Sequence, residues 1–130
     1  MVRKQDQIHG CLLGAAAGDA LGFCVEELTL DDIREKYGPN GIQGYDTING
    51  FATISSHTQL CMFTANGLLF GATRGAIRGV MAPYVKYLEA AYRDWCKTQH
   101  YGVPKGREKS FSWLSSVDAM RSRRCPEPAV

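Results

Sequence analysis

The sequence has no strong excess of either charge. It contains 15 lysine and arginine residues and 13 aspartate and glutamate residues, which gives a formal net charge of +2. Nucleic-acid-binding proteins usually present a strongly basic face, so this balance argues against a nucleic-acid partner. The one local excess is interpreted as a solvated tail; it consists of Arg121, Arg123 and Arg124.

The sequence also lacks cysteines spaced for a metal or redox site. Its five cysteines are odd in number, and no two of them form a C-x-x-C motif. Neither a disulfide framework nor a zinc site is therefore expected. We expect reduced thiols, mostly packed as small apolar groups, in a cytoplasmic protein. The five are Cys11, Cys24, Cys61, Cys96 and Cys125.

A long uninterrupted apolar run is missing as well. Asp19 interrupts the apolar segment Gly10–Val25, and polar residues 5–7 separate this segment from the basic Arg3 and Lys4. A membrane-spanning helix needs about 20 apolar residues, and a signal peptide carries its basic residues next to its apolar part. We therefore expect neither secretion nor a membrane partner.

Alternation of apolar and polar residues, which is typical of strands, is not evident. The chain has 130 residues, of which 45% are hydrophobic and 22% charged. Such a composition excludes a disordered or collagen-like chain and suits one soluble domain. We predict a single all-α domain over residues 1–130.

Helical periodicity predicts a first helix over residues 6–21, because Ile8, Cys11 and Ala15 recur on one side. Glycines at every fourth position form a stripe along it, although each costs a helix roughly 1 kcal/mol relative to alanine. Such a stripe predicts the close approach of another backbone. Its members are Gly10, Gly14, Gly18 and Gly22.

A second helix is predicted to begin after Thr29, which forms a capping box with Asp32. Gly38-Pro39 ends this helix, and the glycine-rich residues 38–50 predict a loop. A third helix is predicted to begin with Ser55 or Ser56 as its N-cap.

The third helix is expected to end near Gly71, followed by a turn-rich loop over residues 71–79. The apolar stripe Ile77–Trp95 predicts the next helix, with Asp94 on its outer side. Pro83 lies in the first turn of this helix, or at a kink if the helix begins earlier. A last short helix is predicted over residues 112–121. Long loops between helices often build a site.

Three polar segments stand in apolar surroundings: residues 18–22 followed by Glu26, residues 55–59, and residues 72–75. The first reads Gly-Asp-Ala-Leu-Gly and the second reads Ser-Ser-His-Thr-Gln. Together with Gly10–Gly14 before them, in this order, they resemble the opening part of the ADP-ribosylglycohydrolase family. The similarity continues through Tyr37-Gly38-Pro39, Tyr92, Trp95, Thr98-Gln99, Trp113-Leu114 and Arg123-Arg124.

This resemblance implies an all-α hydrolase fold, of which the chain is expected to form roughly the first half. Members of the family hold two magnesium ions and cleave the bond between ADP-ribose and a protein side chain or another ADP-ribose. The implied partner is therefore ADP-ribose or an ADP-ribosylated protein.

The resemblance also implies a role for individual residues. Glu26 matches the catalytic glutamate near the metals and the attacking water. Ser55, Ser56 and His57 match the metal-ligating positions. The candidate substrate-binding residues are Asp19, Thr58, Arg74 and Gly75.

Structural interpretations of the same residues remain open. Asp19 is alternatively a helix-terminal carboxylate that accepts hydrogen bonds from amides. Glu26 is alternatively a surface residue. Ser55 or Ser56 is alternatively only a helix cap, and His57 only a residue of the first turn.

The second segment departs from the family pattern, which reads Ser/Thr-Asp-Asp-Thr. Ser56 and His57 stand where that pattern has acids. Magnesium prefers oxygen ligands, whereas a histidine nitrogen suits zinc or copper better. About two negative charges are lost by this count, so we expect magnesium binding to be badly weakened.

The family's further Asp-x-Asp-Thr motif is not found in this sequence, and family members are usually longer. We therefore expect exposed apolar surface, with self-association or a complementing partner to cover it. The predicted function is that of a family protein that ancestrally removed ADP-ribose from modified side chains and is impaired or inactive in this short form. The alternatives are a non-catalytic ADP-ribose-binding protein, a structural crystallin-like protein and a truncated gene product.

Overall fold

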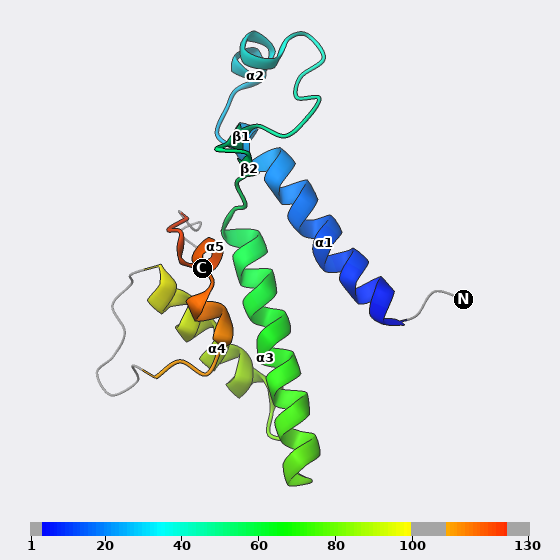
Figure 1. Cartoon of the computed structure of the whole chain (residues 1–130), viewed down its shortest axis with the longest axis vertical. Coiled ribbons are helices and arrows are strands. Elements are labelled where there is room, and N and C mark those ends of the chain that lie inside the picture. Colours follow the sequence, from blue (N-terminus) through cyan, green and yellow to red (C-terminus); the bar gives the residue numbers. More distant parts are fainter. Residues whose placement is uncertain (1–3, 100–108, 125–130) are drawn as a thin grey trace. The chain divides into compact units, whose positions relative to one another are not determined.

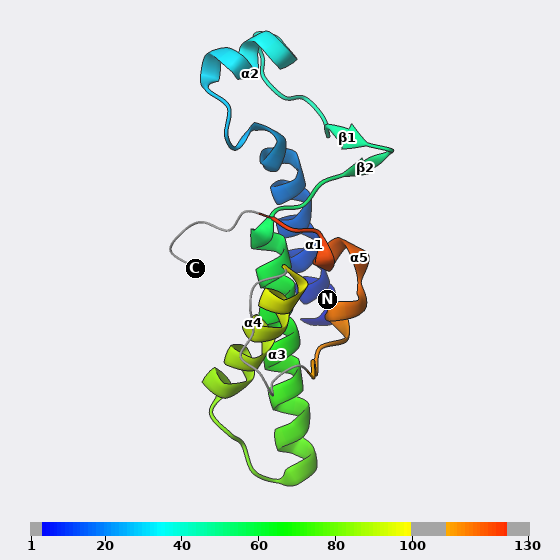
Figure 2. The same ribbon diagram turned by 90° about the vertical axis from the view of Figure 1, so that its left-hand side faces the viewer.

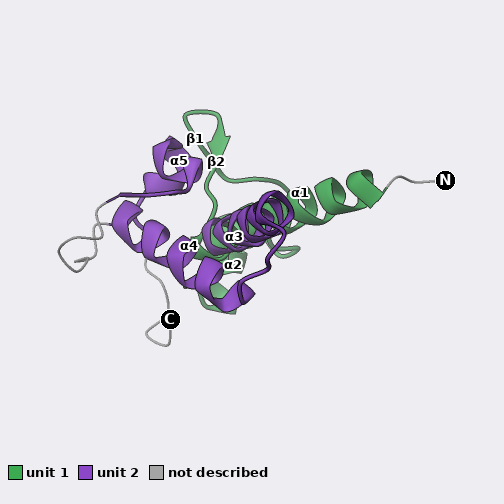
Figure 3. Cartoon of the chain, turned by 90° about the horizontal axis from the view of Figure 1, so that it is seen from below, with its two compact units in different colours: residues 1–58 green, residues 59–130 purple. Residues whose placement is uncertain are grey.

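The computed structural model describes residues 4–99 and 109–124, and most of them are helical (Figure 1). The predicted all-α fold is therefore confirmed. The chain divides into two compact units, residues 1–58 and 59–130, each of which is described by itself (Figure 3). The elements are α1 (Lys4–Gly22), the 3₁₀ helix η1 (Phe23–Val25), α2 (Leu30–Tyr37), β1 (Thr47–Ile48), β2 (Phe51–Ala52), α3 (Ser56–Arg78), α4 (Tyr84–Thr98), the 3₁₀ helix η2 (Trp113–Ser116) and α5 (Asp118–Arg121).

Helix α1 confirms the first predicted helix, but its glycine stripe is open. A Cβ atom built at any of the four stripe glycines, Gly10 to Gly22, would meet no heavy atom of the described residues within 4 Å. Ala20 is the buried residue of this helix, whereas Ile8 and Leu13 are exposed. The predicted close approach of another backbone is therefore not made within the described residues of the first unit.

Residues Lys4–Val25 form a segment long and apolar enough to cross a membrane, by length and composition alone. The argument that this segment is too short was wrong, because helical structure extends beyond the apolar run at its N-terminal end. A core helix and a signal sequence pass the same test, so this property by itself does not establish a membrane span.

Four cysteines of the described residues are free thiols, as predicted. The expectation that most of them pack as small apolar groups was wrong for Cys11 and Cys61, which are exposed, whereas Cys24 and Cys96 are partly buried. Cys125 lies outside the described residues.

Helix α2 confirms the predicted capping box. The Thr29 hydroxyl accepts a hydrogen bond from the Asp32 amide at 3.3 Å, and the Asp32 carboxylate accepts one from the Thr29 amide at 3.1 Å. Gly38 follows the helix with φ of +87°, a conformation that glycine adopts without strain.

The predicted loop after α2 contains a small antiparallel hairpin. Thr47 pairs with Ala52, and Ile48 pairs with Phe51. The turn residues Asn49 and Gly50 both have positive φ, as a type I′ turn requires. The Asn-Gly pair is the strongest short-range hairpin signal in a sequence, but here the strands are too short to show alternation.

Helix α3 continues to Arg78, so the predicted end near Gly71 and the predicted loop over residues 71–79 were wrong. The glycines serve a helix crossing instead of a turn. A Cβ at Gly71 would lie 2.7 Å from the Tyr87 ring, and one at Gly67 would lie 3.1 Å from Ala91 Cβ. These glycines allow α4 to pack closely along α3 (Figure 2).

Helix α4 begins at Tyr84, so Pro83 directly precedes the helix instead of lying in its first turn, and the stripe Ile77–Trp95 does not belong to one helix. Ile77 lies in α3 and Met81 lies in the connecting loop. The buried residues of α4 are Ala91, Asp94, Trp95 and Thr98, so the prediction that Asp94 lies on the outer side was also wrong.

The last predicted helix is divided into η2 and α5 by Val117, whose backbone is extended. Both short helices pack against α4. Leu114 and Met120 join Phe63, Ala91 and Trp95 as buried hydrophobic residues, which form the core of the second unit.

Candidate functional site

Three of the predicted site residues meet in the first unit. One carboxylate oxygen of Asp19, near the end of α1, accepts hydrogen bonds from the Ser55 amide at 2.8 Å and the Thr58 hydroxyl at 2.5 Å. Its other oxygen accepts one from the Ser55 hydroxyl at 2.5 Å. We call these three residues the Asp19 cluster.

The cluster forms because α3 begins there. The first amides of a helix have no partner within the helix, and a negative charge is favoured at this end. Ser55 precedes the helix, and its hydroxyl accepts a hydrogen bond from the His57 amide at 3.0 Å. Ser55 is therefore the N-cap, as predicted. The structural interpretation of Asp19 also holds, since it accepts a hydrogen bond from an amide at a helix terminus, although from a different helix.

These contacts favour the ionised form of Asp19. Burial raises the pKa of its carboxyl, but hydrogen bonds from Ser55 and Thr58, with the nearby His57 ring, together outweigh burial and hold the pKa below its usual range. An ionised carboxylate offers about four acceptor sites, so the three hydrogen bonds to Asp19 leave about one for another ligand.

Ser56 and His57 differ in their surroundings. Ser56 is buried, with 6% of its surface exposed, and its hydroxyl makes no hydrogen bond within the described residues. His57 is exposed, and its Nδ1 lies 3.2 Å from the Ser55 hydroxyl. Neither position places an anionic oxygen at the start of α3.

The remaining predicted site residues are Glu26 in the first unit and Arg74 and Gly75 in the second. Glu26 follows η1, is exposed, and shares no hydrogen bond or ion pair with the cluster in the described part of the chain. Arg74 and Gly75 belong to α3 in the second unit. The Arg74 guanidinium lies 5.9 Å from the centre of the Phe70 ring. Their assignment to substrate stays a prediction, but the loop on which it rested is helical.

The donor set does not fit the two magnesium ions of the family. Magnesium requires several oxygen ligands near octahedral geometry. Within residues 4–99 and 109–124, no group of three or more histidine, cysteine, aspartate or glutamate residues is placed to hold a metal ion. The Asp19 carboxylate is occupied by hydrogen bonds, and Ser56 and His57 supply a neutral hydroxyl and a nitrogen.

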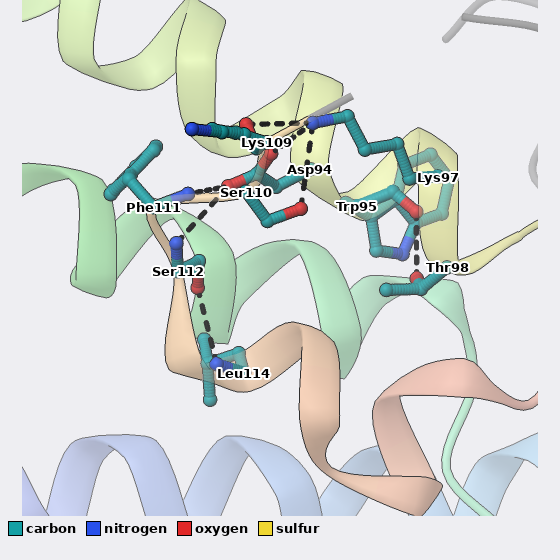
Figure 4. Close-up of polar contacts among 9 residues, drawn as sticks. All are labelled: Asp94, Trp95, Lys97, Thr98, Lys109, Ser110, Phe111, Ser112 and Leu114. Carbon is teal, nitrogen blue, oxygen red and sulfur yellow. Dashed lines mark hydrogen bonds and ion pairs between the residues drawn. The ribbon is translucent and has the colours of Figure 1, made fainter. Parts of the chain in front are cut away.

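Sequence reasoning missed a buried carboxylate in the second unit, Asp94 (Figure 4). One of its oxygens accepts hydrogen bonds from the Phe111 amide at 2.9 Å and the Ser112 amide at 3.1 Å. The other lies 2.9 Å from the Lys97 ammonium, which also donates to the Lys109 carbonyl. Asp94 thus attaches residues 109–112 to α4. The available signal for its burial was its position three residues after Ala91, because residues three apart lie on the same face of a helix.

Two buried glutamines hold the end of the described chain. The Gln59 amide donates to the carbonyls of Ala119 and Ser122 at 2.9 and 3.0 Å, and its oxygen accepts from the Trp95 indole. Gln99 donates to the Met120 carbonyl and accepts from the Arg124 amide. Neither residue could be distinguished from a surface glutamine by sequence alone.

Replacing Asp19 with alanine should lower the free energy of unfolding by about 2–3 kcal/mol at neutral pH, because three hydrogen bonds to a charged group are lost. The folded-state pKa lies below the unfolded value of about 3.9. The contribution of the carboxylate is therefore present above that pH and is lost as the pH falls through the folded pKa.

Urea denaturation of the native and Asp19→Ala proteins would measure this. The pH series should run from about 3 to about 7, because this range includes the unfolded Asp pKa of about 3.9. The difference in stability between the native and Asp19→Ala proteins should narrow as the pH falls below the unfolded Asp value. Asp6→Ala, at an exposed position in the first turn of α1, is the control. A constant difference across the whole pH range would contradict the assignment.

Comparison with known proteins agrees with the motifs. The profile of the ADP-ribosylglycohydrolase family matches residues 1–128. An uncharacterized protein of Archaeoglobus fulgidus is 47% identical over 34 residues, which cover 26% of this chain and only 11% of that protein. No solved structure matches the chain. Because the family profile matches nearly every residue, the chain belongs to the ADP-ribosylglycohydrolase family.

Proposed function

We propose that this chain derives from enzymes that hydrolyse ADP-ribosyl bonds and that, by itself, it does not catalyse this hydrolysis. The observation that carries the proposal is the donor set at the start of α3. Asp19 is occupied by three hydrogen bonds, and Ser56 and His57 provide no carboxylate.

The chemistry of the family explains why this donor set matters. A pair of metal ions positions oxygen atoms and neutralises developing charge, and the protein's part is to fix the ions with anionic ligands. Without carboxylates at positions 56 and 57, the first turn of α3 offers little charge to balance two divalent ions. The hydrogen bonds of Ser55 and Thr58 with Asp19 can still shape this turn without any metal.

The test is release of ADP-ribose from peptides carrying ADP-ribosyl-arginine or ADP-ribosyl-serine, in the presence of magnesium. We expect no release above that of buffer. Release that depends on magnesium would overturn the proposal. An active family member from another source would serve as the positive control for the substrates.

A matched variant tests the two positions directly. Ser56→Asp with His57→Asp restores the acidic pair, and we expect this double variant to bind magnesium more tightly than the native chain in calorimetry. Equal magnesium binding by the two proteins would contradict the importance assigned to these positions.

The ligand class implied by family membership is the ADP-ribosyl group. Calorimetry with ADP-ribose, with and without magnesium, would distinguish a chain that retains binding from one with a structural role only. Heat of binding that does not require magnesium would support retained recognition without hydrolysis.

A further inference from the structure

The end of the α3–α4 hairpin carries large apolar side chains in contact with solvent. Ile77 is 79% exposed, Val80 is 73% exposed and Val85 is 70% exposed. They lie at the end of α3, in the connecting loop and at the beginning of α4, which is the lowest part of the chain in Figures 1 and 2. We call this end of the hairpin, residues 77–86, the tip.

The tip is also basic. Arg78 and Lys86 flank its apolar residues, and the sequence contains no aspartate or glutamate between Asp46 and Glu89. Lys86 has one anionic neighbour, Glu89, at 3.6 Å, and its side chain remains 76% exposed. Two tips would repel one another, so a symmetric contact of tip with tip is disfavoured. A partner for the tip should be anionic and partly apolar.

The first unit presents such a surface. Residues 26–35 contain five carboxylates and one cation, Arg34, which gives this segment a formal charge of −4 (five negative, one positive). All five acidic residues are exposed, and Leu30 among them is 60% exposed. We call residues 26–35 the acidic segment; its carboxylates belong to Glu26, Glu27, Asp31, Asp32 and Glu35.

We propose that the acidic segment of a second copy of this chain docks on the tip. Opposite charge brings the two surfaces together, and contact between Leu30 and the apolar residues of the tip removes them from water. An anionic lipid surface would match the charge of the tip but would leave the acidic segment without a partner. A second copy accounts for both surfaces.

This contact joins two different surfaces, so each added copy leaves one tip and one acidic segment free. Such head-to-tail contacts produce open assemblies unless the rotation closes a ring. The average mass should therefore rise steadily with concentration instead of reaching a plateau at the dimer. It should fall when salt is raised from about 0.05 M to about 0.5 M, because the charges are then screened over a few ångströms.

Sedimentation velocity over a series of protein concentrations is the experiment. The tip variant is Arg78→Glu with Lys86→Glu, and the acidic-segment variant is Glu27→Lys with Glu35→Lys. We expect each variant alone to associate at least about tenfold more weakly than the native chain. All four substituted side chains are exposed, and circular dichroism would confirm that the helices are kept.

Mixing the two variants provides the decisive comparison. The native tip of the acidic-segment variant meets the native acidic segment of the tip variant. The other pairing is weak, because Glu27→Lys with Glu35→Lys brings the acidic segment to a formal charge of zero (three carboxylates, three cations). Association should therefore return in the mixture. Lys4→Glu with Arg121→Glu, at exposed positions outside both surfaces, should associate like the native chain.

Three results would overturn the proposal. The first is a native chain that stays monomeric at every concentration. The second is association that the charge reversals leave unchanged or that the mixture does not restore. The third is a monomeric chain that binds vesicles containing anionic lipid, which would assign the tip to a membrane surface.

Discussion

Replacing Asp94 with alanine should lower the free energy of unfolding of the chain by about 3–5 kcal/mol, which is typical when one partner of a buried ion pair is removed. The side chain is 3% exposed, and the Lys97 side chain, 2.9 Å away, is 17% exposed. Alanine would leave the amides of Phe111 and Ser112 without their acceptor and would remove the anionic partner of the Lys97 ammonium. Urea denaturation would measure the loss.

A carboxylate on the surface of the same helix provides the matched control. Glu89 pairs with Arg93 at 2.6 Å, but its side chain is 48% exposed. Exposed ion pairs contribute little, so Glu89→Ala should cost far less stability than Asp94→Ala. In Asp94→Ala, the amides of Phe111 and Ser112 should also exchange hydrogen faster. Equal stabilities of the Asp94 and Glu89 variants would show that the buried contacts are not important.

Replacing Gln59 with leucine should have an effect of similar size, about 3–4 kcal/mol, although leucine has nearly the same volume. The glutamine is fully buried. Leucine would leave the carbonyls of Ala119 and Ser122 and the indole N–H of Trp95 without partners. Each buried polar group that loses its partner costs about 1–3 kcal/mol, whereas the gain in apolar surface offsets only part of this.

The indole N–H signal of Trp95 in a nitrogen–proton NMR spectrum offers a specific readout. This signal should shift in Gln59→Leu, whereas that of the exposed Trp113 should not. Gln43→Leu is the control at an exposed glutamine and should change stability by less than about 0.5 kcal/mol. A Gln59→Leu protein with native stability would mean that water or another group satisfies these atoms.

Both variants act on the same part of the molecule. Asp94 holds the amides of residues 111 and 112, and Gln59 holds the carbonyls of residues 119 and 122. The segment that carries η2 and α5 is thus attached to α3 and α4 by polar side chains, in addition to the burial of Leu114 and Met120. Specific hydrogen bonds of this kind fix the position of a segment that has few apolar side chains of its own.

Local signals in the sequence predicted helix starts well. Thr29 with Asp32 and Ser55 before α3 were found because a cap depends on residues only two or three positions apart. Pro83 was found for a similar reason, since its ring cannot continue a helix backwards. The Asn49–Gly50 turn carried an equally local signal, whereas alternation, which needs longer strands, was not evident.

Signals that depend on distant neighbours were interpreted less well. Gly71 and Gly75 were assigned to a loop, because glycine is common in turns. Both positions lie within α3, and glycine is required there because Tyr87 and Met81 occupy the space that a side chain would need. The stripe from Gly10 to Gly22 is the reverse case, because a close crossing was predicted and the described residues of the first unit provide no such neighbour.

The sequence by itself determined the family, the helical class and the identity of the groups at the start of α3, because motif order and residue type do not depend on packing. It also showed that positions 56 and 57 lack the acids that magnesium would require. Only the tertiary structure showed that the Asp19 carboxylate accepts hydrogen bonds from Ser55 and Thr58, which lie 36 and 39 residues away. It likewise decided that Asp94 is buried. Both carboxylates are placed by contacts between elements, and no local pattern encodes which distant amide a carboxylate will meet.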